Sequence, residues 1–156
     1  MLYLDHAATT AVRPETREAM VPFFGDDFGN PSGMHAMSQR AKNAMEEARE
    51  RAAQLLGAAR PLDIVFTGGG TEADNLAVTG AALAGGARGG VVTTAIEHEA
   101  VLESAHFVQR LGSPVEVVGV DDAGRVAPEA VADAVTDRTR VVSVMAANNE
   151  VGTVQP

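Results

Sequence analysis

Three short polar segments carry residue types suited to ligand chemistry, and the first is TGGGTEADN at residues 67–75. Its three consecutive glycines allow backbone N–H groups to approach an anion closely. A helix that starts directly after them would add about half a positive charge at its N-terminus. Thr71 offers a hydroxyl in the first turn of that helix. These features predict a phosphate site, with a tight turn that binds nothing as the alternative. The segment has neither the G-K-[ST] of a P-loop nor the G-x-G-x-x-G of a dinucleotide site.

The second segment is Glu97-His98-Glu99. A histidine in this position could stack on a planar ligand or transfer a proton near neutral pH. The alternative is a solvated helix start with no ligand. His106 lies eight residues further on, which is too far for an H-E-x-x-H metal motif, so we expect no metal site here.

The third segment is Asn148-Asn149-Glu150. Side-chain amides placed after a buried strand could donate hydrogen bonds to a ligand oxygen, although consecutive asparagines also form ordinary turns. The single lysine, Lys42, falls on the polar side of a predicted helix, where we expect a solvated surface charge.

Alternating strands and helices would position these segments. Apolar residues at the helical period predict helices over 35–56, 71–83, 98–111 and 128–135, after an irregular arm with a shorter helix over 14–24. Runs of β-branched residues predict strands over 63–66, 91–96, 115–120 and 141–145. This α/β order predicts a mostly parallel sheet with helices on both faces. Ligands of such sheets bind at the carboxyl ends of strands, where all three polar segments should meet.

Composition narrows the classes of partner. The 156 residues carry a net charge of −9, which argues against nucleic acid and anionic membrane surfaces. The absence of cysteine excludes disulfides, thiolate metal sites and a cysteine nucleophile within this sequence. The start of the sequence lacks a secretory signal, and no apolar run is long enough to cross a membrane, so we expect a soluble cytoplasmic protein. The length predicts one domain or a piece of a larger one.

Six segments taken together resemble the cysteine desulfurases, a branch of the class V aminotransferases that uses pyridoxal 5′-phosphate. They are YLDHAATT at 3–10, FGNPSG at 28–33, ARERAAQLLGA at 48–58, IVFTGGGTEADNLAV at 64–78, TTAIEHEAVL at 93–102 and NNEVGTVQP at 148–156. They follow the family's order and approximate spacing. The resemblance therefore covers essentially the whole sequence.

This resemblance implies the PLP-dependent transferase fold of type I. The sequence would supply the N-terminal part of the large domain, with a mostly parallel sheet and flanking helices. Residues 1–60 would form an N-terminal arm and an amphipathic helix, and residues 61–156 part of the cofactor-binding domain.

The resemblance also implies roles for four residues. Gly70 and Thr71 would hold the cofactor phosphate. His98 would stack on the pyridine ring and act as the catalytic proton-transfer group. Asn149 would hydrogen-bond near the phenolic oxygen of the cofactor. PLP itself would supply the electron sink.

The implied reaction removes sulfur from L-cysteine, giving L-alanine and an enzyme persulfide for iron–sulfur cluster assembly or tRNA thiolation. A sulfur-acceptor or scaffold protein and a homodimeric state are expected with it. The family's Schiff-base lysine and nucleophilic cysteine lie downstream of Asn149, beyond the last residue of this sequence, so we expect this polypeptide alone to be inactive. The alternatives are another class V enzyme such as a selenocysteine lyase, and a non-catalytic fragment or binding module.

Overall fold

The computed structural model describes residues 2–86 and 88–156. The chain divides into two compact units, of which the first ends at Phe66 and the second is Thr67–Pro156. The three polar segments singled out above all lie in the second unit. The division expected after residue 60 stays a prediction.

The first unit contains helices and irregular segments. Its elements are α1 (Pro14–Met20), η1 (Val21–Phe24), α2 (Ala36–Leu56) and η2 (Pro61–Asp63). Helix α2 begins where His35 Nδ1 accepts the Ser38 N–H at 3.4 Å. It ends at Gly57, whose φ of 68° is left-handed and suits glycine. The predicted helix is confirmed, but Leu55 and Leu56 of its apolar stripe are exposed.

The strand predicted over residues 63–66 is wrong. Residues 61–63 form η2. Ile64 after it is extended, and residues 64–66 have no strand partner in the described chain. The Arg49 guanidinium of α2 donates to the Ile64 carbonyl and lies 4.9 Å from the ring centroid of Phe66. A β-strand requires a neighbouring strand for its backbone hydrogen bonds. Here a side chain of α2 takes one of these groups instead.

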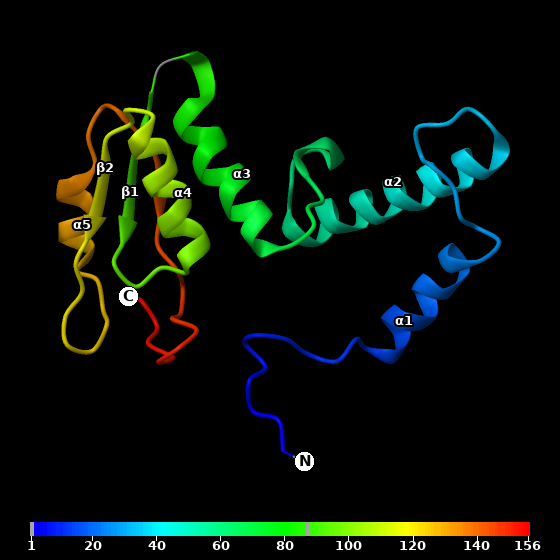
Figure 1. Ribbon diagram of the computed structural model, residues 1–156, viewed down its shortest axis with the longest axis horizontal. Helices are drawn as coiled ribbons and strands as arrows, with labels where there is room; N and C mark the ends of the chain where they lie inside the picture. Colours follow the sequence, from blue (N-terminus) through cyan, green and yellow to red (C-terminus); the bar gives the residue numbers. More distant parts are fainter. Residues whose placement is uncertain (1, 87) are drawn as a thin grey trace. The chain divides into compact units, whose positions relative to one another are not determined.

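The second unit is a parallel sheet covered by helices on both faces (Figure 1). Its elements in chain order are α3 (Gly70–Leu83), η3 (Ala84–Gly86), β1 (Gly90–Thr94), α4 (Glu99–Arg110), β2 (Val115–Val118), α5 (Pro128–Ala134) and β3 (Thr139–Ser143). Strand β1 lies between β2 and β3 and pairs with both in parallel. The prediction of a parallel α/β sheet is confirmed.

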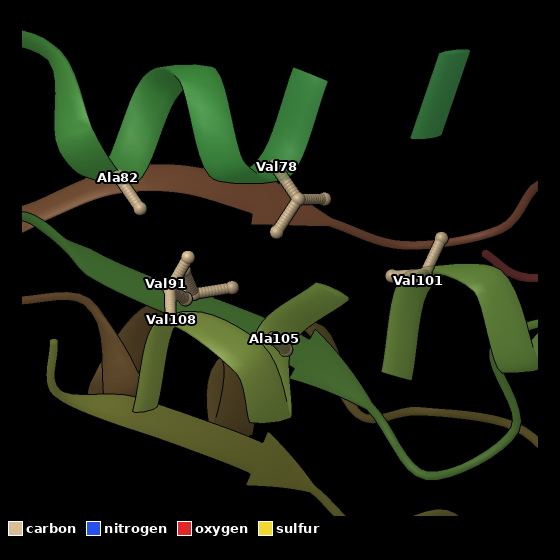
Figure 2. Close-up of a cluster of buried hydrophobic side chains, with 6 residues drawn as sticks. All are labelled: Val78, Ala82, Val91, Val101, Ala105 and Val108. Carbon is tan, nitrogen blue, oxygen red and sulfur yellow. The ribbon is translucent and has the colours of Figure 1, made fainter. Parts of the chain in front are cut away.

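Alternation along β1 builds the two halves of the core. Val91 packs on one face against residues of α3 and α4, which Figure 2 shows pointing toward one another: Val78, Ala82, Val101, Ala105 and Val108. Val92 packs on the other face with Val118 and Val126, and side chains of α5 lie against this second cluster. All five residues of β1 are buried, as expected for the central strand of a parallel sheet.

Helices α3 and α4 pack side by side and run in the same direction (Figure 1). Their N-terminal ends lie at the end of the unit where β1 terminates. The segments that begin α3, begin α4 and follow β3 are thereby brought to one end of the sheet.

Candidate functional site

A cavity of about 400 Å³ is lined by residues that follow the carboxyl ends of β1 and β3. Two of the polar segments line it, namely Ile96, Glu97, His98 and Glu99 from the β1–α4 connection, and Asn148, Asn149 and Glu150 from the segment after β3. The cavity wall holds three carboxyl groups and no lysine or arginine. It is therefore better suited to a neutral or cationic part of a ligand than to an anionic one.

His98 is the N-cap residue of α4. Its Nδ1 accepts a hydrogen bond from the Ala100 N–H at 3.1 Å, which fixes the orientation of the ring. Because Nδ1 accepts, the proton of the neutral ring lies on Nε2. The side chain is exposed and lines the cavity, so the ring is available to a ligand while its other nitrogen holds the helix start. The two alternatives weighed for this residue, a helix start and a ligand contact, are compatible.

Asn149 lines the same cavity as the histidine segment and is exposed. Its amide Nδ2 donates to the carboxylate of the adjacent Glu150 at 3.2 Å. No other side-chain hydrogen bond of Asn149 is found within the described chain. The amide can therefore turn toward a ligand at little cost.

The glycine segment forms a free helix N-terminus. Helix α3 starts at Gly70, and its first internal bond runs from the Ala73 N–H to the Gly69 carbonyl at 3.1 Å. Among residues 2–86 and 88–156, nothing accepts from the three backbone N–H groups of residues 70–72, and no side chain caps them. Three unpaired donors at the positive end of a 14-residue helix form an anion-binding arrangement.

The space around these donors is also open. A side-chain carbon built on Gly69 or Gly70 would have no atom of the second unit within 4 Å apart from its chain neighbours and the backbone of α3. The Glu72 carboxylate, which could have occupied this space, instead accepts the Gly68 N–H at 2.6 Å. The Thr71 hydroxyl makes no hydrogen bond to any described residue. Within the second unit, no side chain thus blocks an anion from the helix end.

The structure brings some of the predicted site residues together and keeps others apart. His98 and Asn149 share the wall of one cavity. The first turn of α3, which contains Gly70 and Thr71, lies at the same end of the unit as the first turn of α4 (Figure 1), but neither residue lines the cavity.

Two residues at the site were not singled out as site residues by sequence reasoning. Glu97 is only 8% exposed, and its Oε1 accepts both the Thr94 hydroxyl at 3.0 Å and the Met145 N–H at 2.6 Å. Asn148 donates from Nδ2 to the Ile96 carbonyl at 2.9 Å. The only sequence feature that could have identified Glu97 as a site residue is its position directly after a buried strand. A glutamate in a polar segment is normally expected to be exposed to solvent, so this feature was not sufficient.

Beyond Asn149 the chain is tied to a different connection. Ala147 and Val154 form an antiparallel bridge. Gln155 accepts the Val126 N–H at 2.8 Å and donates to the Gly124 carbonyl at 2.9 Å, both in the β2–α5 connection. The residues around Asn149 are therefore held from both sides.

Comparison with known proteins identifies the family to which the chain belongs. A profile described as aminotransferase class-V matches residues 2–156. The chain belongs to the class-V aminotransferase family. A curated relative in this family, the cysteine desulfurase IscS of Clostridium botulinum (strain Hall), is 46% identical over 156 residues, which are 99% of this chain and 39% of the relative.

Solved structures of class-V relatives agree with the fold. A chain described as a NifS-like protein superposes with a TM-score of 0.86 at 40% identity, over 97% of this chain and 42% of its own. Another, described as SspA in complex with cysteine, gives 0.89 at 38% identity, over 99% of this chain and 44% of its own. The predicted resemblance and the PLP-dependent transferase fold are confirmed. The chain corresponds to the N-terminal portion of these relatives and spans about two fifths of their length.

The homologues in this family are PLP enzymes, and the class-V chain described here offers a fitting site for parts of that cofactor. The free N–H groups at the start of α3 suit a phosphate. The exposed ring of His98 suits stacking, and the amide of Asn149 suits a ring oxygen. Across the described residues no group of three or more His, Cys, Asp or Glu is arranged to hold a metal ion, and no described helix is both long and apolar enough to cross a membrane.

Proposed function

We propose that this chain forms part of the cofactor site of a PLP-dependent cysteine desulfurase. The observation that carries the proposal is the pairing of two different surfaces at one end of the sheet. One is a helix start with three unpaired N–H donors, and the other is a cavity between His98 and Asn149. A flat molecule with one phosphate matches both surfaces.

Each residue has a distinct task in this proposal. The backbone N–H groups at Gly70 and Thr71, with the Thr71 hydroxyl, bind the phosphate and set the position of the ring. His98 stacks on the ring and serves as the catalytic proton-transfer group, donating the proton on Nε2 because its Nδ1 already accepts the Ala100 N–H. Asn149 donates a hydrogen bond to the phenolic oxygen. PLP, when bound, withdraws electrons from the substrate.

The proposed reaction of the full-length protein converts L-cysteine to L-alanine and transfers the sulfur as a persulfide to an enzyme cysteine. Support comes from relatives described as cysteine desulfurase IscS and from the relative described in complex with cysteine. The finer parts of the proposal are a homodimer in the cytoplasm and a sulfur-acceptor or scaffold protein of an iron–sulfur cluster or tRNA thiolation pathway.

Steady-state turnover tests this proposal. Full-length protein loaded with PLP is mixed with L-cysteine, and alanine is quantified together with enzyme-bound sulfur. Continued release of alanine in the wild type and a loss of at least about 100-fold in His98→Ala are expected. Selenocysteine is the matched alternative substrate. A holoenzyme that turns over selenocysteine but not cysteine, or neither, refutes the proposal.

A further inference from the structure

Two hydrogen bonds join the loop after β1 to the loop after β3, and they run in opposite directions. The side chain of Glu97, in the first loop, accepts the backbone N–H of Met145 in the second. The side chain of Asn148, in the second loop, donates to the backbone carbonyl of Ile96 in the first. Each loop thus supplies one side chain and one backbone group, and we call these two bonds the loop clamp.

Both side chains of the loop clamp are tied on their own side as well. Glu97 Oε1 also accepts the Thr94 hydroxyl, so the carboxylate is held against the end of β1. Asn148 Oδ1 accepts the N–H groups of Glu150 and Val151, each at 2.9 Å, which shapes the turn that carries Asn149. The clamp therefore joins two ordered loops.

The residues next to the clamp are the two proposed ligand contacts. His98 directly follows Glu97, and Asn149 directly follows Asn148. A buried carboxylate is costly unless it is hydrogen-bonded, and Glu97 is the one acidic residue in the described chain that is buried. A glutamate that pointed into solvent would avoid that cost. Glu97 is buried because its carboxylate lies between the two loops, where it accepts the Met145 N–H.

We infer that Glu97 and Asn148 are positioning residues that fix His98 and Asn149 in the wall of the cavity. They act through the neighbouring residues and through the backbone. The inference deepens the proposed function and rests on it, but the mechanical part can be measured without cofactor.

Matched variants of Glu97 separate hydrogen bonding from charge. Glu97→Ala removes the acceptor, whereas Glu97→Gln keeps one accepting oxygen, replaces the other with an amide NH2 group and removes the charge. Amide hydrogen exchange of the full-length, cofactor-free protein should show Met145 exchanging at least about tenfold faster in Glu97→Ala and close to wild type in Glu97→Gln. The His98 ring and Asn149 side-chain amide resonances should shift in Glu97→Ala and not in Glu97→Gln.

A variant of Asn148 tests the opposite bond. Asn148→Asp keeps the oxygen that accepts from Glu150 and Val151 but loses the donor to Ile96. The amides of the turn should stay protected, while Met145 exchanges faster because the two loops separate. Gln109→Glu, which adds one negative charge on an exposed part of α4, is the control and should change none of these readouts.

The cofactor supplies the functional readout. Glu97→Ala and Asn148→Asp should each weaken the apparent PLP affinity about tenfold and alter the visible circular dichroism of bound PLP, and Glu97→Gln should restore both. The inference is overturned if Glu97→Gln is as impaired as Glu97→Ala, or if Glu97→Ala leaves the His98 and Asn149 resonances unchanged. A wild type that binds no PLP refutes the proposed function, and the cofactor-free resonances then still decide the loop clamp.

Discussion

The double role of His98 gives a prediction in which stability and ligand binding can be separated. His98→Ala removes both the ring and the acceptor of the Ala100 N–H. Loss of an N-cap side chain costs about 1 kcal/mol. For a chain of 156 residues that corresponds to a decrease of about 2–4 °C in melting temperature, and the decrease is smaller in a longer protein. The same variant should weaken PLP binding about fivefold, because stacking of aromatic rings contributes about 1 kcal/mol.

His98→Asn is the variant that distinguishes the two effects. Asparagine is among the best N-cap residues, so it should restore most of the lost stability. It has no aromatic ring, so the weakened PLP binding should remain. Thermal unfolding of the cofactor-free protein measures the first effect, and titration with PLP followed by visible absorbance measures the second.

Two results would refute this reasoning. If His98→Asn binds PLP as tightly as the wild type, the ring does not stack on the cofactor. If His98→Ala unfolds at the wild-type temperature, the hydrogen bond to Ala100 does not stabilise α4. If PLP affinity and melting temperature change in parallel in His98→Ala and His98→Asn, His98 acts only as the N-cap of α4.

Further variants test the phosphate site, the core and the first unit. Thr71→Val keeps the shape of the side chain without its hydroxyl, so PLP or inorganic phosphate should bind about fivefold more weakly at unchanged melting temperature; equal binding would exclude a hydroxyl contact. Val91→Ala should lower the free energy of unfolding in urea by about 2 kcal/mol because the side chain is 1% exposed, whereas Val142→Ala, at 45% exposed, should cost about half as much or less. Gly29→Ala should destabilise the first unit, because the added carbon would lie 2.7 Å from the Met37 carbonyl oxygen, and proteolysis within residues 14–56 should accelerate.

The sheet of the second unit could be predicted from the sequence because its signals are local. Val91 and Val92 belong to a run of β-branched residues, and the helical periods on either side require a parallel crossover. Residues 63–66 have the same type of composition, yet no strand forms. Strand formation depends on a partner far along the chain, and the contact with Arg49 leaves no trace in local composition.

The candidate site was predictable to a similar extent. Strand ends and helix starts are set by local pattern, so the convergence of His98 and Asn149 could be expected from topology. The burial of Glu97 could not, because it depends on the Met145 N–H, 48 residues away. Sequence reasoning identified the residues at the mouth of the cavity and missed those that hold its walls together.

The attachment of residues 146–155 at both ends constrains the length of this segment more than its composition. On one side Asn148 is bonded to the β1–α4 connection, and on the other side Gln155 is bonded to the β2–α5 connection. The residues between these two attachment points therefore cover a fixed distance, and Asn149 lies directly after the first of them. Substitution of an exposed residue such as Val151 leaves that distance unchanged. Insertion or deletion of a single residue would change it and would displace Asn149. Among related proteins, this stretch should therefore keep the same number of residues.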